Sequence, residues 1–386
     1  METGSGRGVE RGSFDGLNPN PTSVVTTRSW RRTGGMTTPD PRSQGGAPAL
    51  PDEEQGVRGG DERPPPRRVL VTGGAGFIGA HLLRALERDR RGIRGLISLD
   101  VRDAPEPSRV DGVTYVRADV RTPHLAAVFD EHGVDTVVHL AAVTNAPRGM
   151  DEGEAHSVDV RGTENVLAAA AASGVEHVVL VTSAAAYGYH PDTPVPVEES
   201  VALRGNAEVS LARRKRMVEE SIAQFRGAHP ELPLLVLRPA LVLADGWAPA
   251  VRAAVGRQWI PLANGDGARR SVIWIDDLVD VLSRAVIERR TGTFNVAARG
   301  SVTLGALARC EGTRVVHMPK WLRRTVFHAL WTMGLSRDGP ASLDTLDFDL
   351  VLATDRLQRE LGFTMRLDAP DALARYCASR SRSVNA

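Results

Sequence analysis

The stretch with the clearest chemical meaning is VLVTGGAGFIGAHLL, residues 69–83. Its glycines follow an apolar run typical of a strand and open a helical pattern. The first glycine permits a tight turn, the second lets the backbone approach a pyrophosphate, and the third allows close helix packing. The helix N-terminus would offer N–H groups and a positive dipole to the phosphates. The residues predicted to bind a dinucleotide here are Gly73, Gly76, Phe77, Ile78 and Gly79.

A carboxylate follows at the distance expected for the ribose of such a cofactor. The next predicted strand, GLISLD, ends at Asp100, about 20 residues after the last glycine. A carboxylate there accepts hydrogen bonds from the 2′ and 3′ hydroxyls and repels a 2′-phosphate, which favours NAD over NADP. Arg102 weakens that preference, because a guanidinium just past the strand is able to pair with a 2′-phosphate.

These residues need a sheet to hold them, and the pattern after Val69 predicts one. Short β-branched runs alternate with Ala-, Leu- and Arg-rich helical patterns. The runs are continuously apolar, as expected for strands covered by helices on both faces. Alternating β and α units predict an α/β fold with a Rossmann-type doubly wound parallel sheet. We assign it to residues 67–243, followed by a small, mainly substrate-binding C-terminal lobe (244–378) and a tail (379–386).

The first 66 residues differ in composition from the rest. They are rich in Gly, Pro, Ser, Thr and Arg and lack apolar periodicity. Such a segment buries too little surface to offset the entropy of ordering, so we predict that it is disordered. Met36 lies inside it and is an alternative start of the protein.

Bulk composition narrows the class of partner. The chain has 386 residues, 42% of them hydrophobic and 25% charged, with a formal net charge of +1. This balance gives no reason to expect nucleic acid as a partner, and no stretch reaches the 18 apolar residues of a membrane span. The basic run Arg213–Arg216 is typical of a solvated helix face.

The number and spacing of the cysteines argue against further classes of site. Cys310 and Cys377 are the only cysteines and form no CxxC or His/Cys cluster. We therefore expect neither a metal site nor a disulfide framework, and the pattern fits the reducing cytoplasm.

Further stretches stand in an order that one family shares. After GGAGFIG come ADV (118–120), HLAA (139–142), VRGTENVL (160–167), VTSAAAYG (181–188), LRPALVL (237–243) and NGDGARRSVIWIDDLVDVL (264–282). Over about residues 68–378 the chain resembles the extended short-chain dehydrogenase/reductase family, in particular its NAD-dependent epimerase/dehydratase branch. The resemblance implies an epimerase, dehydratase or dehydrogenase acting on a sugar-like or hydroxylated small molecule.

The resemblance also implies roles for individual residues. Asp119 and Val120 would contact the adenine, Pro239 would lie near the carboxamide, and Leu140, Ala141 and Ala142 would lie beside the nicotinamide ribose. In the family, a serine holds the substrate oxygen and a lysine holds the ribose hydroxyls. A tyrosine four residues before that lysine exchanges the proton. Here the serine and lysine are Ser183 and Lys215.

The chain departs from that pattern at the tyrosine. In SLARRKRMVEE, residues 210–220, the position four before Lys215 is Leu211, and no tyrosine occurs between Ser200 and Glu220. Leucine cannot exchange a proton, so the usual mechanism cannot operate unchanged. A second departure is Asp159, where the family often has asparagine.

Three explanations remain open for the missing tyrosine. Another residue supplies the proton, with Tyr187, Tyr189 and His190 as candidates because they closely follow Ser183. Otherwise the protein binds NAD but performs a reduced chemistry. The third explanation is a redox-inactive NAD-binding regulatory or scaffold protein.

The predicted lobe holds two further features. The resemblance places a diphosphate-binding arginine near Arg269 and Arg270, and we favour Arg269. The tract WLRRTVFHALWTMGL, residues 321–335, has Trp321 and Trp331 among apolar residues partly at helical spacing. It is interpreted as a helix that packs on the lobe or on a dimer partner, as a lid over an apolar substrate, or as a membrane-surface helix. A homodimer is a further expectation from the resemblance.

Overall fold

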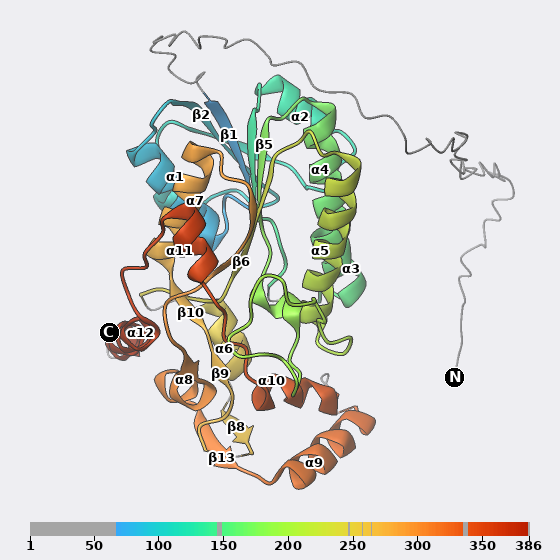
Figure 1. Ribbon diagram of the computed structural model, residues 1–386, viewed down its shortest axis with the longest axis vertical. Coiled ribbons are helices and arrows are strands. Elements are labelled where there is room, and N and C mark those ends of the chain that lie inside the picture. The colour runs from blue at the N-terminus through green and yellow to red at the C-terminus, as the bar shows by residue number, and fades with distance from the viewer. Residues whose placement is uncertain are drawn as a thin grey trace, which may run out of the picture. The chain divides into compact units, whose positions relative to one another are not determined.

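A single parallel sheet forms the centre of the protein. The computed structural model describes residues 67–144, 149–245, 248–256, 258–263, 265–334 and 339–384 (Figure 1). The segment predicted to be disordered, 1–66, and the alternative start Met36 lie outside these residues. The sheet has seven strands in the order β11-β6-β5-β4-β1-β2-β3. The winding reverses between β1 and β4, as in a doubly wound sheet, so the predicted fold class is confirmed.

The strands coincide with the apolar runs of the sequence. Most of their residues are buried, because helices cover both faces of the sheet. Their bounds are Arg67–Thr72 (β1), Ile93–Asp100 (β2), Val113–Arg117 (β3), Thr136–His139 (β4), His177–Val181 (β5), Leu234–Pro239 (β6) and Gly292–Val296 (β11).

Two helical layers enclose the sheet (Figure 1). One hydrophobic cluster joins the sheet to Phe77–Arg88 (α1), Ile275–Glu288 (α7) and Asp355–Leu361 (α11). The other joins it to Leu125–Glu131 (α2), Gly162–Ala172 (α4) and Ser210–Ala228 (α5). Because all seven strands run parallel, the strand ends that carry predicted site residues meet at one edge of the sheet.

A short irregular helix leads into α4. After Glu152–His156 (α3), the residues Ser157–Arg161 (η2) form one π-helical turn that runs directly into α4. Such turns are rare and occur frequently at functional sites. This turn carries Asp159, the second departure from the family pattern.

The C-terminal half builds a lobe beyond the strand ends. Its elements are Leu241–Leu243 (β7), Pro249–Val255 (α6), Trp259–Leu262 (β8), Arg269–Arg270 (β9), Val272–Trp274 (β10), Val302–Thr303 (β12), Leu304–Cys310 (α8), Arg314–His317 (β13), Lys320–Thr332 (α9), Asp344–Asp347 (α10) and Ala369–Val384 (α12). The same half returns β11 and α7 to the central sheet. Helix α12 includes the first residues of the predicted tail. The boundary at residue 243 stays a prediction. Among the described helices, none is both long and apolar enough to cross a membrane.

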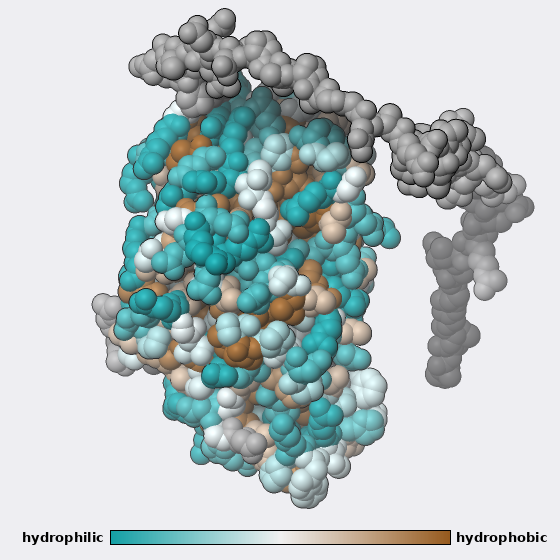
Figure 2. Space-filling model, in the orientation of Figure 1, coloured by the Kyte–Doolittle hydropathy of each residue, from teal (hydrophilic) through white to brown (hydrophobic). Residues whose placement is uncertain are grey.

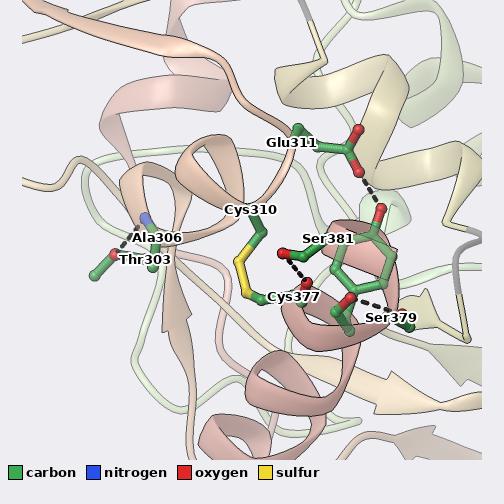
Figure 3. Close-up of a disulfide and its surroundings, with 8 residues drawn as sticks. Thr303, Ala306, Cys310, Glu311, Cys377, Ser379 and Ser381 are labelled. Carbon is green, nitrogen blue, oxygen red and sulfur yellow. Dashed lines mark hydrogen bonds between the residues drawn. A yellow bond between two sulfur atoms is a disulfide. The ribbon is translucent and has the colours of Figure 1, made fainter. Parts of the chain in front are cut away.

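The two cysteines are paired, so the expectation of no disulfide is wrong. Cys310 at the end of α8 and Cys377 in α12 form a disulfide with a Cα–Cα distance of 4.9 Å (Figure 3). Next to it the Tyr376 hydroxyl bonds the Glu311 carboxylate. Sequence spacing hides this pair, because 67 positions separate the two cysteines and only the docking of α12 on α8 brings them together.

Loss of this cross-link is expected to lower stability. Closing a loop of 67 residues restricts the unfolded chain, which corresponds to about 2–4 kcal/mol. Urea unfolding without reductant should therefore show Cys377→Ser to be less stable than wild type by that amount. Dithiothreitol should bring wild type down to the variant and leave the variant unchanged; equal stability of both oxidised proteins would contradict the expectation.

Candidate active site

The glycine-rich turn packs tightly against the end of β4. Gly73 has φ +69°, and a Cβ there would lie 2.7 Å from the Ala141 nitrogen. A Cβ on Gly79 would meet the carbonyl of Gly73 and would lie 2.7 Å from the Cα of Gly74. Helix α1 begins after Gly76, whose lack of a side chain keeps the helix N-terminus open to a phosphate. The turn therefore fits the pyrophosphate of a dinucleotide.

Asp100 connects this turn to the end of β2. Its buried carboxylate accepts hydrogen bonds from the backbone nitrogens of Ala75 (3.2 Å) and Arg102 (3.0 Å). The Arg102 side chain is 70% exposed and turns back toward Asp100, with Nε 3.6 Å from Oδ1. The guanidinium is thus drawn toward the carboxylate rather than set apart for a 2′-phosphate, which supports the preference for NAD.

After β3, the two predicted adenine-binding residues are an ion-paired aspartate and a buried valine. Asp119 pairs with Arg121 at 2.6 Å, and this hydrogen bond holds the pKa of the Asp119 carboxyl below its usual value. Val120 is buried against Gly162 of α4, and its carbonyl accepts a bond of 2.6 Å from the amide of Asn165. Both residues lie at the same sheet edge as Asp100, where an adenine would be expected.

A buried histidine fixes the end of β4. His139 Nδ1 lies 2.8 Å from the Thr72 hydroxyl and Nε2 lies 3.0 Å from the Thr163 hydroxyl. The Thr163 hydroxyl donates to the Asp159 carbonyl, so the network assigns the ring proton to Nε2. The Thr72 hydroxyl in turn accepts from the nitrogens of Leu140 and Ala141. A neutral His139 therefore positions the predicted nicotinamide segment, a role that the sequence did not reveal.

Ser183 follows strand β5, and Lys215 lies on helix α5. The Ser183 hydroxyl, just after β5, accepts a bond of 3.2 Å from the Ala185 nitrogen. Lys215 on α5 is 5% exposed, and no carboxylate in the described part of the chain pairs with it. Its charge is nevertheless close enough to lower the pKa of His139. A buried ammonium without a counter-ion is costly unless polar groups solvate it, which favours a hydroxyl-rich ligand at this position.

The arginines next to Lys215 all form ion pairs with carboxylates. Two residues of the basic run Arg213–Arg216 are buried, namely Arg214 and Lys215. Arg214 is 3% exposed; its Nε bonds Asp159 at 2.9 Å, and it also bonds Glu152. Arg216 pairs with Glu220 on the helix surface. The prediction that this basic run is a solvated face is therefore wrong for Arg214 and Lys215.

The pair of Asp159 and Arg214 clamps the segment after β4. Asp159 accepts a bond of 2.7 Å from the Val143 nitrogen, and Arg214 donates one of 2.9 Å to the Val143 carbonyl. The aspartate that replaces the family's asparagine is thus neutralised by an arginine directly before Lys215. The sequence showed both residues but gave no sign that they meet.

Leu211 lies one helical turn before Lys215 and so projects from the same side of α5. It is partly buried and belongs to none of the hydrophobic clusters formed by the described residues. The leucine therefore occupies the tyrosine position without being part of the core.

The three candidate proton donors differ in their surroundings. The Tyr187 hydroxyl donates to Asn295 and accepts from Arg238, both at 2.8 Å, inside the core. Glu219 pairs with Arg238 at 2.9 Å and so is also turned away from Lys215. These bonds commit Tyr187 to a structural role.

His190 and Tyr189 lie on the loop that follows. His190 Nε2 bonds the Arg204 carbonyl at 2.7 Å. The Tyr189 ring lies under the Arg270 guanidinium at 4.9 Å, and no described residue bonds its hydroxyl. The Asn206 side chain bonds both backbone groups of Tyr189, which holds the ring in place.

The two arginines of β9 face opposite ways, as neighbours on a strand do. Arg269, the predicted substrate residue, is exposed and pairs with Asp349 at 2.8 Å. Arg270 is buried and bonds the carbonyls of Arg269, Phe348 and Thr345. No described carboxylate forms an ion pair with Arg270.

The sheet edge thus gathers the predicted cofactor residues and leaves Arg269 apart from them. The ends of β1 to β4 carry Gly73, Asp100, Asp119 and Leu140, in that order. Pro239 ends β6 beside Val296 of β11. Arg269 lies on the surface of the lobe. Individual contacts to cofactor and substrate remain predictions.

The fold and the residues at the sheet edge define a protein of the short-chain dehydrogenase/reductase type. The chain belongs to the NAD dependent epimerase/dehydratase family, whose model matches residues 69–297. The predicted family is therefore confirmed. The family is defined by its dependence on NAD, which confirms the predicted cofactor and the oxidoreductase class at the level of the family. The comparisons lend no support to the redox-inactive alternative.

Relatives among known proteins agree with this assignment. An uncharacterized protein of Mycobacterium tuberculosis H37Rv is 28% identical over 322 residues, which cover 82% of this chain and 84% of that protein. A UDP-glucose 4-epimerase of Mycolicibacterium smegmatis is 29% identical over 233 residues, or 56% of this chain and 72% of that enzyme.

Solved structures show the same fold. The Thermus thermophilus UDP-glucose 4-epimerase in complex with NAD has a TM-score of 0.61 and 22% identity, covering 81% of this chain and 99% of that chain. The dTDP-glucose 4,6-dehydratase of Streptomyces venezuelae with NAD and TYD bound has a TM-score of 0.63 and 22% identity, covering 82% and 98%.

The buried His139 predicts a loss of stability in mild acid. Burial, followed by the charge of Lys215, lowers its pKa from 6.5 to about 4. Between these values the unfolded chain binds a proton that the folded protein does not, so stability falls as the pH falls. From pH 7 to pH 5 this contributes about 2 kcal/mol.

Urea unfolding at the two pH values measures this contribution. His139→Gln should remove about 2 kcal/mol of the pH dependence of the unfolding free energy. His328→Gln, a matched change at an exposed histidine of α9, should leave the dependence as in wild type. An unchanged dependence in His139→Gln would show that this ring does not titrate as inferred.

Proposed function

We propose that this protein is an NAD-dependent epimerase or dehydratase acting on a sugar nucleotide. The observation that carries the proposal is Lys215, buried at the sheet edge without an ion-pair partner among the described residues. Ribose hydroxyls would solvate its ammonium, while the glycine turn and Asp100 would hold the rest of the cofactor. Bound NAD supplies hydride acceptance and return, which both reaction types require.

The substrate class is supported by several features together. Relatives include UDP-glucose 4-epimerases, and structural neighbours were solved with NAD and UDP-glucose. Arg269 and Arg270 are both candidates to bind a diphosphate. The missing carboxylate partner favours Arg270. Its partners are neutral backbone carbonyls and the Tyr189 ring, which leave its charge uncompensated, whereas Arg269 is already neutralised by Asp349.

The protein groups divide the chemistry among them. Ser183 would hold the substrate oxygen, and Lys215 would hold the ribose and stabilise negative charge on that oxygen. The proton that leaves the oxygen as hydride moves needs another acceptor, because Leu211 offers none. Tyr189 is the candidate we favour: its hydroxyl has no partner among the described residues, and Arg270 beside its ring stabilises the phenolate. Burial acts against this and raises the pKa of Tyr189.

Binding of NAD is the first test of this function. Lys215→Met should weaken NAD binding roughly tenfold or more, because a hydrogen bond from a charged group is lost. The apo variant should unfold at the same temperature as wild type or higher, since an unpaired buried charge is removed. Arg216→Met, the same change at a surface-paired neighbour, serves as control and should bind NAD normally.

Calorimetric titration with NAD gives the affinities, and thermal unfolding gives the stabilities. Normal NAD binding by Lys215→Met would contradict the role assigned to this lysine. Wild-type protein that binds no NAD would refute the proposed function as a whole.

Replacement of Tyr189 tests the proton donor. Tyr189→Phe should lower kcat about 10²–10⁴-fold without changing NAD affinity, because it removes acid/base assistance and leaves the cofactor site intact. Tyr115→Phe is the matched control, because the Tyr115 hydroxyl on the outermost strand β3 bonds the Val110 nitrogen. Reduction of bound NAD by UDP-glucose in a single turnover, followed by absorbance, provides the measurement.

Leu211→Tyr distinguishes a displaced proton donor from a lost one. If Tyr189 has taken over the chemistry, Leu211→Tyr should not raise the wild-type rate. A large gain from near zero would instead identify an enzyme that lost its donor, and would remove Tyr189 from the mechanism.

Oligomeric state and location also remain predictions. The homodimer is an expectation from the family alone. The predicted location, the cytoplasm, has one observation against it, the Cys310–Cys377 disulfide, because such bonds are uncommon in reducing compartments.

A further inference from the structure

The outer end of the lobe exposes large apolar side chains. On α9 the exposed fractions are 71% for Trp321, 48% for Trp331, and 62% for Met333 just after the helix. Val316 of β13 is 39% exposed. Helix α9 lies at the end of the lobe that points away from the central sheet (Figure 1). We call α9, Met333 and β13 the lobe-tip surface.

Helix geometry sorts α9 into three faces. Arg323 and Phe327 form the buried face, where Arg323 pairs with Asp347 and bonds the Pro261 carbonyl. At 100° per residue, the exposed residues fall into an outward face and a flank, while Val326 and Leu330 are partly buried. The outward face is uncharged and consists of Trp321, Leu322, Thr325, Ala329, Thr332 and Met333. The flank consists of Lys320, Arg324, His328 and Trp331.

Charge on this surface has a single sign. Residues 313–334 contain no aspartate or glutamate. Arg324 is neutralised by Asp344 of α10. Exposed Arg314 and Lys320 have no carboxylate partner in the described chain, and the Lys320 ammonium lies 5.7 Å from the centroid of the Phe348 ring. The uncharged face is therefore bordered by unneutralised cations.

The composition is that of an interface rather than of a core. In Figure 2 this end of the lobe is pale to teal rather than brown. Tryptophan lies near the middle of that scale and threonine close to it. Tryptophan rings next to lysine and arginine are typical of helices that lie in the headgroup region of a bilayer.

We propose that the lobe-tip surface docks on an anionic phospholipid bilayer, independently of the catalytic site. Helix α9 would lie parallel to the membrane with Trp321, Leu322 and Met333 among the headgroups. Arg314 and Lys320 would face anionic phosphates, each strengthening the attraction. Such binding is peripheral and reversible, and the described helices include no membrane span.

Other occupants fit these observations less well. A symmetric contact between two copies would bring the same basic flanks together, and residues 313–334 offer no acid to pair with them. A lid over the substrate would turn the tryptophans inward. Here Arg323 and Phe327 point inward, and Trp321 and Trp331 are exposed.

Cosedimentation with vesicles tests the proposal. Full-length protein should bind vesicles of equal parts phosphatidylcholine and phosphatidylglycerol, and salt should weaken binding. Vesicles of phosphatidylcholine alone should bind little. Lys320→Glu should weaken binding roughly twentyfold, because one attraction is replaced by a repulsion. Trp321→Ala should weaken it roughly tenfold through lost apolar burial.

Matched controls separate docking from unfolding and from self-association. Arg88→Glu reverses an exposed charge on α1, at the sheet, and should bind vesicles like wild type. Both tip variants should bind NAD as wild type does, so failure here is distinguishable from failure of the proposed function. The proposal is overturned if both vesicle types bind equally. It is also overturned if the tip variants bind undiminished, or if light scattering shows a dimer that Trp321→Ala dissociates.

Discussion

The buried ammonium of Lys215 has no counter-ion in the described chain, and the charges around it are arranged so that none is available. Glu219, one turn along α5, pairs with Arg238 and accepts a bond from Thr182. Asp159 pairs with Arg214. Each nearby carboxylate is thus satisfied by an arginine, so water or a ligand is left to solvate the ammonium of the lysine. Under the proposed function, the ribose hydroxyls of NAD would supply polar groups at that point.

The two departures from the family pattern belong to one rearrangement of the site. Asp159 would be an unpaired buried carboxylate without Arg214, and Arg214 would be an unpaired buried cation without Asp159 and Glu152. Their bonds to both backbone groups of Val143 fix the segment that leaves β4. The helix that carries Leu211 is therefore tied to this segment by an ordered ion network.

The features of the fold that could be predicted from the sequence are those that depend on local patterns. Continuous apolar runs gave the strands, and the glycine spacing with Asp100 gave the dinucleotide turn, because each depends on neighbours within about 30 residues. The features that escaped depend on distant partners. Arg214 meets Asp159 across 55 positions, and His139 meets Thr72 across 67. The cysteine pair spans 67 as well. The basic run Arg213–Arg216 therefore resembled a solvated helix face, although Arg214 and Lys215 are buried at the candidate site.

Lys215 and Leu211, four residues apart on α5, are subject to different physical constraints. Lys215 is fixed by the helix that carries it and by the cost of its buried charge, and neither depends on a tyrosine at position 211. Under the proposed function, cofactor binding would therefore be separable from proton transfer in this chain. Proton transfer needs only a hydroxyl of suitable pKa near the substrate oxygen, which a loop residue can supply if it is held firmly. The two bonds from Asn206 hold the backbone of Tyr189, and in the proposed mechanism Arg270 beside the ring would stabilise the phenolate.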